Sequence, residues 1–126
     1  MNDEEAIRRA LALLCRLRDQ DRYDEWIELF APDGTFDYGV GVFTGRDAIL
    51  AHVTEYFPAY GKHLCLNSVI DIDGDEASVM SDFVKLHPLG DGTTGFEVAA
   101  AGRYDDRFAR DGKAWRVRAR TVLIER

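Results

Sequence analysis

Residues 63–87 read HLCLNSVIDIDGDEASVMSDFVKLH, and this stretch decides the fold. Apolar and polar side chains alternate on both sides of Asp73-Gly74-Asp75, and an Asp-Gly pair between such runs is a strong signal for a tight turn. The pattern predicts a β-hairpin with strands at residues 63–71 and 77–87. One face of the second strand is expected to carry Ala77, Val79, Ser81 and Phe83.

The residues that precede the hairpin predict helices. Residues 4–18 carry apolar side chains at the spacing of a helix that is buried on one side, and Asn2 or Asp3 can cap its start. A second, shorter helix is predicted at residues 23–30, with Asp21 as its cap. The first part of the chain is therefore expected to be mainly helical.

The remaining segments complete the order of elements. Pro32-Asp33-Gly34 is expected to end the second helix, a short strand follows at residues 35–38, and a glycine-rich loop leads to a third helix at residues 47–60. After the hairpin come strands at residues 96–108 and 113–125. Helices followed by an antiparallel meander predict an α+β fold, in which a cone-shaped, curved antiparallel sheet wraps around three N-terminal helices.

Composition and charge restrict the class of protein. The 126 residues predict one domain, residues 1–126, that is large enough to hold an internal cavity. A formal net charge of −7 argues against nucleic acid as a partner. The basic run alternates with apolar residues and is expected to form one face of a strand: Arg116, Arg118 and Arg120.

Neither membrane insertion nor secretion is expected. No apolar run approaches the roughly 20 residues of a membrane span, and the N-terminus lacks the pattern of a signal peptide. The expected compartment is the cytoplasm, where Cys15 and Cys65 would be free thiols. His63 and Cys65 are two potential metal ligands on one strand face, but no Cys-x-x-Cys is present and we expect no metal site. No phosphate-binding loop indicates a nucleotide cofactor, and we expect no cofactor.

Four polar residues fall on segments with helix and strand patterns: Asp19, Tyr38, His63 and His87. Imidazole exchanges protons near neutral pH, and a carboxylate can orient it and favour its charged form, so His63 with Asp19 is a candidate acid-base pair. Tyr38 can donate a hydrogen bond to a substrate carbonyl, which requires Asp37 to point the other way. His52, on the third helix, is expected to be a surface residue.

These residues also have structural interpretations. Asp19 is compatible with a solvated helix end, His63 with an exposed strand start, His87 with an exposed loop and Tyr38 with a core position. The small residues at 99–102 either leave room on the inner face of the sheet or pack tightly against a helix.

Four segments carry a resemblance to a known family. They are RDQDRYDEWIELFAPD at 18–33, TGRDAI at 44–49, GRYDD at 102–106 and GKAWRV at 112–117. In this order and spacing they resemble the nuclear-transport-factor-2-like (NTF2-like) superfamily, in the SnoaL-like, polyketide-cyclase-like branch that contains scytalone dehydratase. The resemblance covers nearly the whole chain and implies the NTF2-like, cystatin-like α+β barrel.

The resemblance also implies a site and a reaction. In the dehydratase, an aspartate near the end of helix one, a tyrosine on the first strand and a histidine on each of the next two strands line the pocket. Asp19, Tyr38, His63 and His87 match these positions. The implied activity is that of a cofactor-independent lyase: His63, oriented by Asp19, removes a proton next to a carbonyl, and His87 protonates the departing hydroxyl.

Two departures from the dehydratase concern the substrate. Arg18 replaces a tyrosine, and the segment 99–103 lacks polar residues that the dehydratase has there. The expected substrate is therefore not scytalone itself but a small cyclic hydroxy-carbonyl or polyketide-like compound. The expected substrate-binding residues are Arg18, Phe36, Phe57, Val69, Phe83 and Phe96.

Further expectations follow from the resemblance. The dehydratase has a C-terminal extension after its last strand, so we expect the cavity to be more open here or to be closed by a neighbouring subunit of a homo-oligomer, a trimer or a dimer. Two alternatives to a lyase remain. One is an isomerase or cyclase of the ketosteroid-isomerase type, in which Asp37 is the basic carboxylate, and the other is a non-catalytic ligand-binding module.

Overall fold

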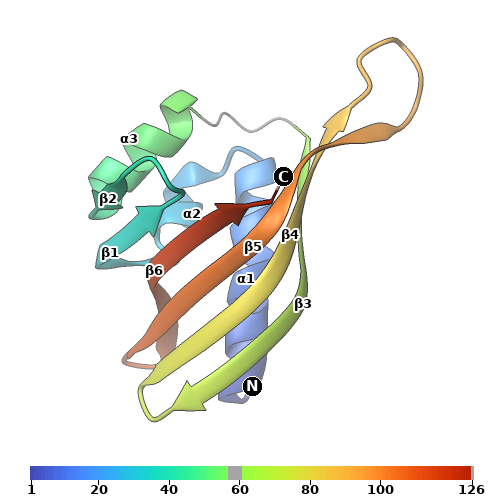
Figure 1. Ribbon diagram of the computed structural model, residues 1–126. Helices are drawn as coiled ribbons and strands as arrows, with labels where there is room; N and C mark the ends of the chain where they lie inside the picture. Colours follow the sequence, from blue (N-terminus) through green and yellow to red (C-terminus); the bar gives the residue numbers. More distant parts are fainter. Residues whose placement is uncertain (57–60, 126) are drawn as a thin grey trace.

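Within the described residues, the chain forms three helices and six strands (Figure 1). The computed structural model describes residues 1–56 and 61–125. The helices are α1 (Asp3–Asp19), α2 (Tyr23–Ile27) and α3 (Arg46–Tyr56). The strands are β1 (Phe30–Asp37), β2 (Val42–Thr44), β3 (Lys62–Asp73), β4 (Glu76–Pro88), β5 (Phe96–Asp111) and β6 (Ala114–Ile124).

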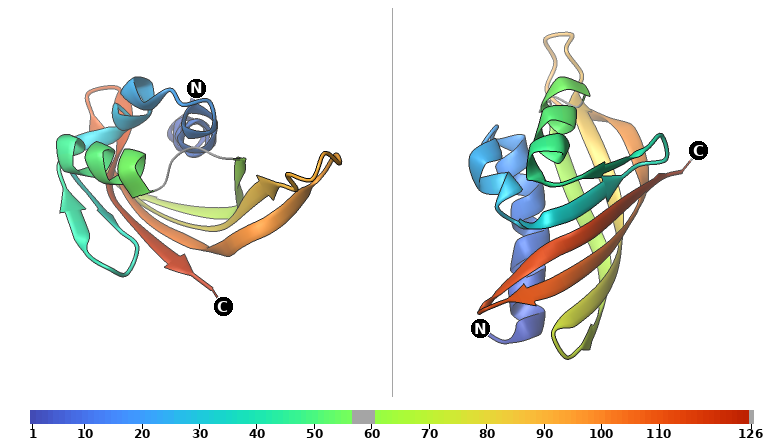
Figure 2. Two further views of the ribbon diagram at one scale, coloured as in Figure 1. Left: turned by 90° about the horizontal axis from the view of Figure 1, so that it is seen from above. Right: turned by 90° about the vertical axis from the view of Figure 1, so that its left-hand side faces the viewer.

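The strands form one curved sheet in the order β2-β1-β6-β5-β4-β3. The predicted antiparallel meander from β3 to β6 is confirmed, but β1 pairs with β6 in parallel, so the sheet is mixed and not wholly antiparallel. Figure 2 shows the three helices on the concave side of the sheet. The predicted α+β class, with a curved sheet around N-terminal helices, is confirmed.

The segment between α1 and β1 differs from the prediction. Helix α2 ends at Ile27, because Phe30 is fully buried and already pairs with Val117 of β6. Pro32-Asp33-Gly34 lies within β1, at a register irregularity between Phe30 and Thr35, which is where a strand tolerates proline. Asp21 does not cap α2: it has a positive φ of 57°, and the N-cap position is Arg22.

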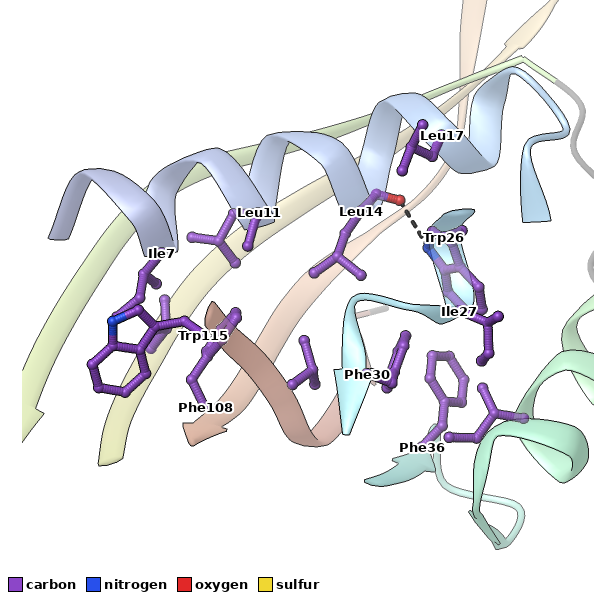
Figure 3. Close-up of a cluster of buried hydrophobic side chains, with 14 of the residues drawn as sticks. Ile7, Leu11, Leu14, Leu17, Trp26, Ile27, Phe30, Phe36, Phe108 and Trp115 are labelled. Carbon is purple, nitrogen blue, oxygen red and sulfur yellow. Dashed lines mark hydrogen bonds between the residues drawn. The ribbon is translucent and has the colours of Figure 1, made fainter. Parts of the chain in front are cut away.

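Helix α1 supplies one side of the hydrophobic core, and the concave face of the sheet supplies the other. The Asn2 side chain caps α1 by accepting a hydrogen bond from the backbone N–H of Glu5 at 2.8 Å. Figure 3 shows the buried side chains of α1 facing those of α2 and the strands, and the indole N–H of Trp26 donates to the Leu14 carbonyl at 3.0 Å. Each such aliphatic or aromatic side chain contributes about 1.5–3 kcal/mol by its burial. The α1 side chains are Ile7, Leu11, Leu14 and Leu17.

The core fills only one end of the concave face. The inner side chains of β4 near its start, Ala77 and Val79, belong to the core, whereas Lys85 and His87 near its end do not. Helix α1 ends at Asp19, and the inner face of β4 continues past the core as the lining of a cavity. The space for a ligand therefore lies near the C-terminal end of α1, where helix and sheet no longer pack directly on each other.

Candidate active site

A cavity of about 480 Å³ opens at this end of the sheet. Its volume is within the usual range for sites that bind small molecules. Most of its lining is apolar or aromatic, with a group of basic side chains among it. The described lining residues are Arg18, Phe36, Tyr38, Tyr56, His63, Phe83, Lys85, His87, Ala99, Ala100, Tyr104, Arg120, Val122 and Ile124.

Strand alternation determines which side chains reach the cavity. On β4, every second residue faces inward, which places Phe83, Lys85 and His87 in the lining. At the end of β1, Phe36 and Tyr38 line the cavity. Asp37 lies between them and is not among the lining residues; its carboxylate accepts the backbone N–H of Gly39 at 2.9 Å. The carboxylate that the isomerase alternative would use is therefore engaged in a turn.

Asp19 and His63 form a hydrogen-bonded pair at the junction of α1 and β3. The ring Nδ1 of His63 lies 2.6 Å from Asp19 Oδ1, and the backbone N–H of His63 donates to Asp19 Oδ2 at 3.0 Å. Because an ionised carboxylate only accepts hydrogen bonds, Nδ1 carries the proton and Nε2 has the lone pair. Asp19 lies behind His63 and is not itself part of the described lining. His63 is therefore oriented with Nε2 as its proton-accepting nitrogen, on the side where Lys85 also lines the cavity.

The surroundings of His63 favour its neutral form. Burial lowers the pKa of the imidazole below its usual value of 6.5, and the positive charges of Arg18 and Lys85 lower it further. As expected, the Asp19 carboxylate favours the charged form and raises the pKa of His63, but burial and the two cations outweigh it. The Lys85 ammonium lies 3.4 Å from His63 Nε2 and donates to it. A neutral His63 is ready to accept a proton at physiological pH.

His52 is not the surface residue that the sequence analysis expects. Its side chain is buried, with 9% of the residue exposed, and its Nε2 lies 2.6 Å from the hydroxyl of Tyr38. The ring also stacks on Phe43, with 3.8 Å between the ring centroids. The missed signal is helical spacing, since Ile49, His52, Val53 and Tyr56 share one side of α3. His52 fixes the phenol that is the candidate hydrogen-bond donor to a substrate.

A buried ion pair that the sequence analysis missed lies beside the cavity. Arg120 donates to both carboxylate oxygens of Asp106, at 2.8 and 3.0 Å, and the two residues are 5% and 0% exposed. The Arg120 guanidinium also lies over the ring of Tyr104, 3.8 Å from its centroid. Although burial opposes the charge, Asp106 raises the pKa of Arg120 overall, so the guanidinium stays charged. Arg120 therefore does not share one strand face with the exposed Arg118.

The small residues of β5 leave room for the cavity. Ala99 and Ala100 both line it, although adjacent strand residues normally face opposite sides. The register explains this: Lys85 pairs with Ala100 and Leu86 pairs with Val98, so Ala99 is an extra residue in a β-bulge. Gly102 has a different role, because a Cβ at this position would lie 2.0 Å from the Leu123 carbonyl oxygen.

The structure separates the six expected substrate-binding residues. Arg18, Phe36 and Phe83 line the cavity, whereas Phe57 lies outside the described residues. The prediction that Val69 and Phe96 bind the substrate is wrong, since these residues are 62% and 50% exposed on the outer face of the sheet. The sequence analysis missed Lys85, which alternation from His87 indicates, and Tyr104.

No group of three or more His, Cys, Asp and Glu side chains in residues 1–56 and 61–125 is arranged to hold a metal ion. In the same part of the chain, no helix is long and apolar enough to cross a bilayer.

Comparison with known proteins assigns the chain to a family. The SnoaL-like domain matches residues 1–121. The protein belongs to the SnoaL-like family. An uncharacterised protein of Mycobacterium tuberculosis is 33% identical over 105 residues, which are 79% of this chain and 69% of the relative.

Solved structures agree on the fold of this SnoaL-like chain. An NTF2-like protein with a cystatin-like fold from Novosphingobium aromaticivorans is 25% identical with a TM-score of 0.85, over 97% of this chain and 81% of its own. A proposed scytalone dehydratase from the same organism has a TM-score of 0.83 at 23% identity, over 98% of this chain and 85% of its own. The NTF2-like, SnoaL-like assignment is confirmed.

Proposed function

We propose that the protein is a cofactor-independent lyase that eliminates water from a small cyclic hydroxy-carbonyl or polyketide-like compound. The observation that carries this proposal is the orientation of His63, a cavity-lining residue whose Nδ1 is held by Asp19 at 2.6 Å while Nε2 lies 3.4 Å from the Lys85 ammonium, another lining residue. A neutral imidazole with a fixed tautomer is suited to general base catalysis. The SnoaL-like family and the similarity in fold to a proposed scytalone dehydratase support the same reaction class.

Each step of the elimination has a candidate group. His63 Nε2 takes the proton from the carbon next to the carbonyl, and the electron pair of the broken C–H bond forms an enolate. Tyr38, held by His52, donates a hydrogen bond to the enolate oxygen. His87 gives a proton to the departing hydroxyl as the C–O bond breaks, water leaves and a conjugated double bond forms. His63 then returns its proton through solvent, and His87 regains one.

A panel of hydroxylated cyclic ketones and phenols tests this proposal. The expected result is a new ultraviolet absorbance of a conjugated enone, with a product lighter by one water in the mass spectrum. His63→Gln and Asp19→Asn are expected to reduce kcat about 10²- to 10⁴-fold, the usual contribution of a general base. Asp21→Asn is the matched control, because Asp21 is an exposed carboxylate two residues after Asp19. Unchanged turnover in His63→Gln contradicts the mechanism.

The same assay separates the alternatives. A product with the mass of the substrate indicates an isomerase or cyclase that uses the same base. Saturable binding of panel compounds without any product indicates a ligand-binding module.

A further inference from the structure

The basic side chains of the cavity gather at the end that contains His63. Arg18, Lys85 and Arg120 line the cavity, and none of the described lining residues is an aspartate or glutamate. Two carboxylates approach this end from behind the lining, and both are engaged: Asp106 binds Arg120, and Asp19 binds His63. The described part of the cavity is therefore apolar over most of its surface and positively charged at one end.

Arg18 and Lys85 are the two cations in this group that act on His63. Burial lowers the pKa of Arg18, which means that its charge is held in surroundings that solvate it poorly. Burial, followed by the charge of Arg18, also lowers the pKa of Lys85, so the two cations are close enough to repel each other. The Asp19 carboxylate raises the pKa of Lys85 but does not cancel these effects, so a further anion between the two cations would reduce the cost of keeping them together in a half-buried site.

We propose that the substrate of this cavity carries a carboxylate, which binds between Arg18 and Lys85 while its ring or chain lies against the apolar lining. This inference rests on the proposed function, because it uses the same cavity and the same base. It narrows the substrate class from hydroxy-carbonyl compounds in general to hydroxy-carbonyl acids.

Carboxylate binding would also prepare the base. The Lys85 ammonium donates to His63 Nε2, the nitrogen that must accept the proton. When Lys85 donates to a substrate carboxylate instead, that nitrogen loses its hydrogen-bond donor. The anion also offsets the positive charges of Arg18 and Lys85, which together with burial lower the pKa of His63, while Asp19 continues to raise it. An acidic substrate would in this way make His63 a stronger base at the moment of binding.

Pairs of compounds with the same shape, an acid and its neutral amide, test whether the cavity binds a carboxylate. Benzoate, phenylacetate and cinnamate carry the anion, and benzamide, phenylacetamide and cinnamide are their neutral counterparts. Calorimetric titration is expected to show binding of at least one acid, about tenfold or more tighter than its amide, with an affinity that falls as salt rises. Lys85→Met is expected to weaken binding of the acid about tenfold and to leave the amide unchanged.

Control variants separate charge from folding. Lys85→Arg keeps the positive charge and is expected to retain most of the affinity for the acid. Lys113→Met removes an exposed lysine at the turn between β5 and β6 and is expected to change nothing. A spectroscopic readout comes from the His63 ring protons, whose titration is expected to move to higher pH when the acid is bound, and thermal unfolding confirms that each variant folds.

Three results overturn the inference: the amide binds as tightly as the acid, Lys85→Met leaves binding of the acid unchanged, or none of the acids binds at millimolar concentration. The inference and the proposed function can fail separately. If His63→Gln loses turnover while acid and amide bind equally, the elimination reaction is supported and the substrate carboxylate is contradicted. Selective binding of the acid without any turnover rejects the elimination and keeps the carboxylate site.

Discussion

Asp106→Asn is expected to destabilise the protein more than almost any other substitution that keeps the size of the side chain. The variant keeps the size of the side chain but removes the negative charge that faces Arg120, a residue that is only 5% exposed. Breaking one partner of a buried ion pair costs about 3–5 kcal/mol, because the remaining charge is left uncompensated. Arg120 lines the cavity, so the same change is also expected to loosen the site.

The expected shift in melting temperature follows from the size of the chain. The entropy of unfolding is about 2.1 cal/mol/K per residue, which gives about 0.26 kcal/mol/K for 126 residues. A loss of 3–5 kcal/mol therefore lowers the Tm by about 11–19 °C, which circular dichroism or calorimetry measures directly. The matched control is Asp105→Asn, one residue earlier on β5.

Asp105 forms an exposed pair with Arg107 at 3.8 Å, and such pairs contribute at most about 1 kcal/mol. The Tm of the Asp105→Asn variant is expected to fall by less than about 4 °C. A third variant removes both charges of the buried pair, Asp106→Leu with Arg120→Met, and is expected to recover most of the lost stability. A Tm for Asp106→Asn within about 4 °C of the wild type would refute the reasoning, since it would mean that Arg120 is not held as an isolated charge.

Three further predictions concern the site. Because burial and the charges of Arg18 and Lys85 lower the folded-state pKa of His63, the His63 ring is expected to titrate below 6.5 by NMR. Below pH 6.5 the unfolded chain then binds more protons at His63 than the folded protein does, so acidification lowers the stability. His63→Gln is expected to remove this part of the loss. A His63 titration at or above pH 6.5 contradicts the prediction. His52→Phe is expected to lower kcat about tenfold or more with little change in KM, because Tyr38 loses its hydrogen-bond partner. In a protein that already carries Tyr38→Phe, adding His52→Phe is expected to have no larger effect, which a double-mutant cycle checks. Ala100→Leu is expected to abolish ligand binding by filling the cavity, whereas Val98→Leu, on the outer face, leaves calorimetric titrations unchanged; equal effects of the two contradict the assigned faces.

Much of the fold could be predicted because its signals are local. The α1 stripe, the Asp-Gly turn of the hairpin and the alternation of β4 each depend on neighbouring residues, and all three are confirmed. The parallel pairing of β1 with β6 joins residues 84–87 positions apart in the sequence, and no local pattern reports such a contact. The family resemblance recovered the overall architecture but not this direction of pairing.

The errors in the lining residues share one physical cause. A β-bulge adds one residue to a strand, so every side chain after it changes face. In β3 the register shifts between Leu66 and Val69, where Asn67 has a φ of 55°, and this puts Val69 outside. The extra residue Ala99 does the same to Phe96 in β5.

A third β-bulge, in β6, caused a residue of the site to be missed in the prediction. In β6, Phe108 pairs with Val117 and Arg107 pairs with Ala119, so Arg118 is the extra residue and Arg120 turns inward. A strictly alternating strand would have kept all three arginines on one face. Sequence patterns give the period of a strand, but they do not show where that period is interrupted.

Asp19 has two structural roles in this protein. Its carboxylate accepts the backbone N–H of His63, the second residue of β3, and also the ring N–H of the same residue. The start of the strand and the tautomer of the base are thus set by one side chain, so the geometry of the base is already complete once the chain has folded. The same economy makes position 19 vulnerable: any replacement that alters the chemistry there also alters the join between the first helix and the hairpin.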